Sequence, residues 1–105
     1  MKFDLELTYS IFEDKVDNTF TVNLGESTLD LQLVEATQIK PVPKGPGVPE
    51  SLRDEPFSLL FRGPESTFLP QRLYDFNHET LGEFTMFITA TGKDEEGIYY
   101  EALVN

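Results

Sequence analysis

Residues that carry out chemistry are scarce in this sequence. The chain has no cysteine, which excludes disulfides, thiol catalysis and thiolate metal sites. It has a single histidine, His78, which any Ser–His–acid triad would have to use. His78 stands between Asn77 and Glu79 in a turn-like segment, which favours turn capping over catalysis. With one histidine and no cysteine, we expect no zinc or copper site within the chain.

Basic residues are also few. Eight lysines and arginines face 19 aspartates and glutamates, for a formal net charge of −11. The acids are spread evenly, with nine acids and four bases in residues 1–52 and ten acids and four bases in residues 53–105. Binding to nucleic acid or to anionic membranes depends on cationic side chains. We therefore expect neither a nucleic acid nor a membrane among the partners.

Long apolar runs are missing from the chain. The segment Met1-Lys2-Phe3-Asp4-Leu5-Glu6 carries acids where a signal peptide would need an apolar stretch. No segment approaches the length of a membrane span. The expectation is a protein without a signal peptide, located in the cytoplasm or in a particle assembled there.

The usual ligand-binding and catalytic motifs are absent. Gly45-Pro46-Gly47 has proline where a phosphate-binding loop needs backbone donors, and no serine lies in a Gly-x-Ser-x-Gly setting. The acidic run Asp94-Glu95-Glu96 lacks the ligand spacing of a calcium loop and indicates a solvated turn. The sequence therefore predicts no catalytic residue, no metal ligand and no cofactor, and a protein that is not an enzyme.

Aromatic residues, in contrast, are plentiful. Nine phenylalanines and four tyrosines contribute to a hydrophobic share of 39%. Each such side chain buries a large area, which predicts an aromatic-rich core and argues against disorder. The length of 105 residues fits one domain, spanning residues 1–105.

Apolar and polar residues alternate in several segments, as is typical of half-buried strands. In one of them, Phe20, Val22 and Leu24 share a face. The expected strands are residues 19–24, 29–35, 57–62, 72–77, 84–91 and 98–104. The last three, in sequence order, are expected to form a meander.

Two local features complete the expected fold. A short helix is predicted over residues 9–15, capped by Thr8. The adjacent apolar residues in Leu33-Val34-Glu35 break the alternation and predict a β-bulge. The fold class is mainly β: a small antiparallel barrel or sandwich of about six strands with one short N-terminal helix. The pattern leaves barrel and sandwich open.

Residues 40–54 are rich in proline and glycine and predict a long loop. Loops of this length serve as working surfaces or as mobile connectors, and the sequence leaves both readings open. As an interaction loop, its candidate residues are Pro41, Pro43, Lys44, Pro46, Val48 and Pro49.

Two charged residues within strand segments suggest a structural ion pair. Arg62 ends a strongly apolar strand, and Glu101 lies inside the last strand. If both side chains turn inward they should pair, because a lone buried charge is costly.

Several segments together carry a resemblance to a known family. They are Asp-Glu-Pro-Phe-Ser-Leu-Leu-Phe-Arg-Gly-Pro at 54–64, Phe-Leu-Pro-Gln at 68–71, Leu-Gly-Glu-Phe at 81–84 and Tyr-Glu-Ala-Leu-Val-Asn at 100–105. The chain resembles, from about Phe12 to Asn105, an uncharacterised family of small bacterial domains associated with gene neighbourhoods that encode phage-tail-collar-like proteins. The resemblance implies no catalytic residue.

These observations favour a non-enzymatic structural or protein-interaction module, with a phage-tail-like or fibre assembly as the setting that the resemblance implies. We expect a protein partner, whose identity the sequence leaves open together with the oligomeric state. The alternative is a small-molecule-binding barrel whose cavity is lined by Tyr74, Phe76, Tyr99 and Tyr100. An enzyme that uses carboxylates alone and an acidic mimic of DNA are weaker readings.

Overall fold

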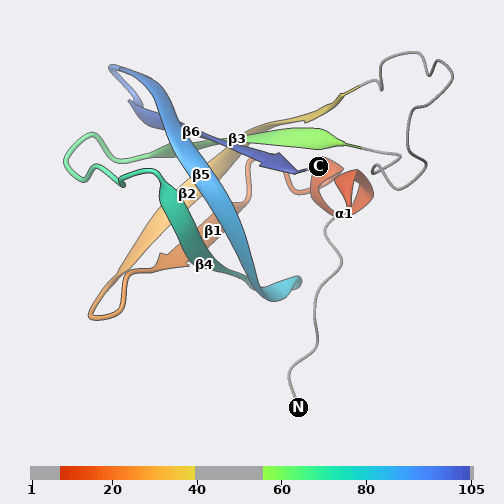
Figure 1. Ribbon diagram of the computed structural model, residues 1–105, viewed down its shortest axis with the longest axis horizontal. Helices are drawn as coiled ribbons and strands as arrows, with labels where there is room; N and C mark the ends of the chain where they lie inside the picture. Colours follow the sequence, from red (N-terminus) through yellow and green to blue (C-terminus); the bar gives the residue numbers. More distant parts are fainter. Residues whose placement is uncertain (1–7, 40–55, 105) are drawn as a thin grey trace, which may run out of the picture.

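The computed structural model describes residues 8–39 and 56–104, which form a closed antiparallel barrel of six strands with one short helix (Figure 1). The elements are α1 (Tyr9–Glu13), β1 (Thr19–Asn23), β2 (Thr28–Gln38), β3 (Phe57–Gly63), β4 (Arg72–His78), β5 (Gly82–Asp94) and β6 (Gly97–Val104). The mainly-β class is confirmed, and of the two expected architectures the structure is the barrel.

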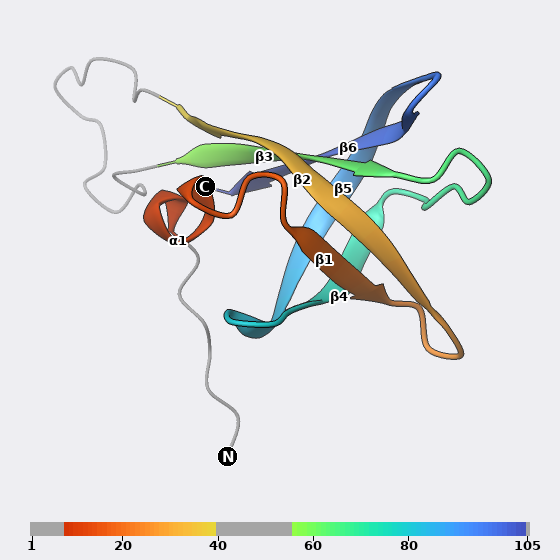
Figure 2. The same cartoon turned by 180° about the vertical axis from the view of Figure 1, so that it is seen from behind.

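The barrel consists of two meanders, β1–β2–β3 and β4–β5–β6. Pairing of β3 with β6 and of β1 with β4 joins the meanders into a closed ring, and every pair is antiparallel. Figure 1 shows the barrel from the side of β4 and β5, and Figure 2 shows it from the side of β1 and β2. The expected C-terminal meander is confirmed. Each strand of the ring pairs with two neighbours, although parts of some strands pair on one side only, such as residues 82–88 of β5, which pair with β4.

Two bulges shift the strand register. The first, between Leu33 and Glu35 of β2, is the predicted one and returns the alternation to phase after two adjacent apolar residues. The second, between Ala90 and Gly92 of β5, was not predicted. Strands β2 and β5 are longer than the alternation of apolar and polar residues predicted. Their ends continue to pair with neighbouring strands beyond the alternating residues.

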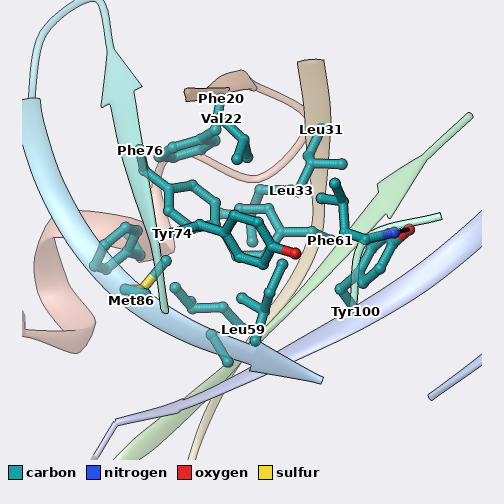
Figure 3. Packing of buried hydrophobic residues seen from close by; sticks show 14 of the residues in the cluster. Phe20, Val22, Leu31, Leu33, Leu59, Phe61, Tyr74, Phe76, Met86 and Tyr100 are labelled. Atoms are coloured by element: carbon teal, nitrogen blue, oxygen red, sulfur yellow. Dashed lines mark hydrogen bonds between the residues drawn. The ribbon is translucent and has the colours of Figure 1, made fainter. Parts of the chain in front are cut away.

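The interior is filled by side chains from all six strands, from α1 and from the connection before β4 (Figure 3). The buried apolar residues are Phe12, Phe20, Val22, Leu31, Leu33, Phe57, Leu59, Phe61, Leu69, Tyr74, Phe76, Phe84, Met86, Ile88, Ile98, Tyr100 and Ala102. Aromatic rings are in direct contact throughout, as in the stacked pair Phe76 and Phe84 with centroids 5.6 Å apart. The expected aromatic-rich core is confirmed.

Helix α1 closes one end of the barrel. Its Phe12 is fully buried, with ring centroids 5.7 Å from Phe84, 5.8 Å from Phe57 and 6.1 Å from Phe20. The helix ends at Glu13, two residues before the expected end. Thr8 occupies the predicted N-cap position, but its hydroxyl makes no capping hydrogen bond. A helix of five residues is unstable alone, so the burial of Phe12 is what holds it in place.

The connection between β3 and β4 closes the other end. Leu69 enters the core, and its backbone N–H donates to the hydroxyl of Tyr100 at 3.0 Å. The hydroxyl of Tyr74 donates to the carbonyl of Pro70 at 2.6 Å. Two tyrosines of the barrel therefore hold this connection with their polar tips while their rings fill the interior.

The packing of Phe12 leads to a prediction of stability. Phe12→Ala should lower the free energy of unfolding by about 3–5 kcal/mol, because it removes a buried ring that contacts three others and leaves a cavity. Urea unfolding followed by circular dichroism measures the loss. Phe68→Ala is the matched control, since Phe68 is 61% exposed and should change stability by no more than about 0.5 kcal/mol. Equal losses of stability for the two substitutions would contradict the conclusion that α1 closes one end of the barrel through Phe12.

Candidate functional site

His78 is the only histidine, and its surroundings define what it can do. Its ring is buried, 3% exposed, and lies on Phe20 with centroids 4.6 Å apart. Nδ1 accepts hydrogen bonds from the backbone N–H groups of Thr80 at 3.1 Å and Leu81 at 3.3 Å. Nδ1 is therefore unprotonated, and Nε2–H donates to Oδ1 of Asn18 at 2.9 Å.

This arrangement makes His78 a structural residue. Both ring nitrogens have partners, and burial lowers the pKa of His78 below its ordinary value, which favours the neutral ring. The side chain joins the turn between β4 and β5 to Asn18, which precedes β1. The predicted turn-capping role is confirmed.

The two predicted ion-pair residues both face outward. Arg62 lies opposite Tyr99, and Glu101 lies exposed opposite Leu60. The guanidinium of Arg62 contacts a carboxylate oxygen of Glu96 at 3.1 Å and donates to the side-chain oxygen of Gln32. An exposed pair of Arg62 and Glu96 thus takes the place of the expected inward pair with Glu101, because outward residues of β3 reach the turn before β6.

The remaining candidates are the interaction loop and the acidic turn. The interaction-loop residues Pro41 to Pro49 lie outside the described residues. Asp94 accepts from the Glu96 N–H at 2.8 Å and the Tyr99 hydroxyl at 2.9 Å, and these bonds lower its pKa. It thereby orders the turn between β5 and β6. Among the residues that the structure describes, no group of three or more His, Asp or Glu side chains could hold a metal ion.

The four aromatic residues expected to line a cavity do not enclose one together, and only Phe76 lines the depression on the outer wall described below. Tyr74, Phe76 and Tyr100 are buried within the filled core, and Tyr99 lies on the outside of β6. Burial raises the pKa of Tyr74, whose hydroxyl is engaged with Pro70. Among the described residues, the exposed side chains lie on the outer wall of the barrel and in the turns between its strands.

A polar depression of about 420 Å³ lies on the outer face of β1, β4 and β5. Its outward side chains stand in two rows of cross-strand neighbours: Thr21, Asn77 and Glu83 in one, and Thr28, Asn23, Asp75 and Thr85 in the other. All of them carry side-chain oxygen atoms, and none is a lysine or arginine. The depression therefore presents hydrogen-bond acceptors and negative charge.

Next to this depression lies an exposed apolar pair. Leu73 of β4 and Phe87 of β5 are direct cross-strand partners, 62% and 47% exposed. Leu73 lies two residues before Asp75 on β4, and Phe87 lies two residues after Thr85 on β5, so the pair lies on the same outer face at the border of the depression. The sequence indicated that Phe87 faces outward, because Phe87 is out of phase with the inward-facing residues Phe84, Met86 and Ile88. Alternation alone did not show that Leu73 would lie beside it.

The fold and this outer wall define a closed six-stranded β-barrel domain with an acidic, partly apolar surface. The chain belongs to the family described as a domain of unknown function, DUF6916, which matches residues 7–104. Comparison with curated proteins and with solved structures gave no match. Membership of an uncharacterised family is thus confirmed, while the association with phage-tail-collar-like neighbourhoods stays a prediction. Within residues 8–39 and 56–104, no helix has the length and apolar character that crossing a membrane would need.

The environment of His78 predicts a pH dependence of stability. Its folded-state pKa is lowered, so its contribution is complete above the unfolded-state pKa of about 6.5 and is lost as the pH falls towards the folded-state value. The free energy of unfolding of wild type and His78→Gln, measured in urea between about pH 5 and pH 8, should differ most above about pH 6.5.

The comparison of the two proteins removes the background from the many carboxylates, which both share. A direct NMR titration of the imidazole should give a midpoint below the ordinary histidine value. A difference between the proteins that grows as the pH falls would contradict a neutral, turn-capping His78.

Proposed function

We propose that this domain is a non-enzymatic protein-interaction module that binds a different protein through the outer face of β4 and β5. The observation that carries the proposal is the exposed pair Leu73 and Phe87 on the outside of a closed barrel. The resemblance noted in the sequence makes a phage-tail-like or fibre assembly the setting in which such a module would act.

The fold itself does not need this pair to be apolar. Alternating positions on β4 and β5 place Tyr74 and Met86 in the core, while Leu73 and Phe87 lie outside. Single exposed apolar residues are common, but two large ones in direct cross-strand contact form a continuous apolar surface. Apolar and aromatic side chains at the centre of a contact surface, surrounded by polar ones, are typical of protein interfaces.

A small-molecule site gains no comparable support. The candidate lining residues Tyr74, Phe76 and Tyr100 pack against other core side chains. Catalysis by His78 gains no support either, since both ring nitrogens of this residue are engaged within the fold. A second copy of the chain is disfavoured as partner, because two molecules of net charge −11 repel each other.

A photo-cross-linking experiment tests the proposal. Benzoylphenylalanine is placed at Phe87, and in parallel at Leu60, a half-buried outward position on β3, which lies opposite β4 in the ring. Irradiation in cells that produce the protein natively should give one discrete protein adduct from position 87 and none from position 60. Identical adduct patterns at both positions, or an adduct only with a second copy, would overturn the proposal.

The apolar pair itself is tested by a double substitution. With the cross-linker at Thr85, Leu73→Ser/Phe87→Ser should reduce the adduct yield about tenfold or more, as expected for residues at the centre of an interface. Leu60→Ser is the matched control and should leave the yield unchanged. Thermal melts of all variants show whether the barrel is retained, which is expected because outward cross-strand pairs contribute only about 0.2–1 kcal/mol.

A further inference from the structure

We infer that the partner surface is basic: it places an apolar anchor on Leu73 and Phe87 and directs lysine or arginine side chains into the adjoining polar depression. This inference rests on the proposed function and specifies the chemistry of the partner. The proposed occupant is a protein segment and not a free cation, because the apolar pair requires an apolar side chain on the partner. The acids of the depression then complement the positive charge of the partner's basic side chains.

The apolar pair and the depression form one continuous surface. The cross-strand row that follows Leu73 and Phe87 is Asp75 and Thr85, and the row after that contains Asn77 and Glu83. Two residues along a strand span about 7 Å, so the carboxylates lie about 7 and 14 Å from the apolar pair. An extended partner segment with an apolar residue at position i and basic residues at i+2 and i+4 has the same spacing.

The charged residues that line the depression are all acidic. Asp75 and Glu83 line the depression, and Asp30 adjoins it through a hydrogen bond from the Thr21 hydroxyl at 3.0 Å. The described lysines and arginines are Lys15, Arg62, Arg72 and Lys93, and none of them lines the depression. Two are engaged elsewhere, Lys15 with Asp14 and Arg62 with Glu96.

The carboxylates also keep acceptor capacity for a partner. The Thr85 hydroxyl donates to Oδ1 of Asp75 at 3.0 Å, as the Thr21 hydroxyl does to Asp30. Within residues 8–39 and 56–104, no salt bridge engages Asp75 or Glu83. Cross-strand threonines thus orient the two aspartates without neutralising them, and a cationic side chain would gain charge-assisted hydrogen bonds there.

A peptide titration followed by amide NMR tests the inference. The probe is a ten-residue extended peptide with leucine at position i and lysine at i+2 and i+4, and the controls are a peptide of the same composition with the lysines permuted and one with glutamine for lysine. The patterned peptide should shift amide resonances of β4, β5 and β1 around the depression, and its affinity should fall as salt is added. Equal binding of the permuted peptide, or shifts spread evenly around the barrel, would overturn the inference.

Charge reversal provides the matched variants. Asp75→Lys/Glu83→Lys should weaken binding of the patterned peptide about tenfold or more, whereas Glu35→Lys/Glu101→Lys, exposed acids on β2 and β6, should change it less than about threefold. Melting temperatures confirm folding of both pairs. An equal loss for the two pairs would overturn the inference.

The cellular cross-link from position 85 distinguishes failure of the proposed function from failure of the basic-partner inference. If Leu73→Ser/Phe87→Ser abolishes the adduct and Asp75→Lys/Glu83→Lys leaves it intact, the interaction module stands and the basic partner is overturned. If no adduct forms while the patterned peptide still binds the depression selectively, the charge inference stands and the proposed cellular function is overturned.

Discussion

Pairing of β1 with β4 is the contact on which the rest of the structure depends, because it closes the sheet into a ring. Closure directs every inward side chain into one core and every outward side chain towards solvent. The ring still leaves parts of its strands paired on one side only, such as residues 82–88 of β5, which pair with β4. Leu73 and Phe87 lie on the outside of this ring with exposed side chains.

The ring still needs its two ends covered, and aromatic side chains do this. Phe12 enters from α1 at one end, and Leu69 enters at the other beneath the hydroxyls of Tyr74 and Tyr100. His78 contributes to the first end by joining the β4–β5 turn to Asn18. The buried polar groups of Tyr74, His78 and Tyr100 are thereby hydrogen-bonded to segments that cover the ends of the barrel.

The outer wall is not uniform around the ring. On β3 and β6 the outward residues include Arg62, whose charge is balanced by Glu96. On β1, β4 and β5 they are threonines, asparagines and acids beside an apolar pair, with no base among the residues that line the depression. Arg62 is thus paired within the fold, whereas among the described residues the acids that line the depression form no salt bridge.

The sequence by itself determined the class of fold. Period-two alternation located all six strands, and the adjacent Leu33 and Val34 located a bulge, because side-chain direction in a strand is a local property. Tertiary structure decided what depends on contacts between distant residues: closure into a barrel, Glu96 in place of Glu101 beside Arg62, and the meeting of Leu73 with Phe87. Register between strands is set by packing of the whole core, so no local pattern specifies which outward residues become neighbours.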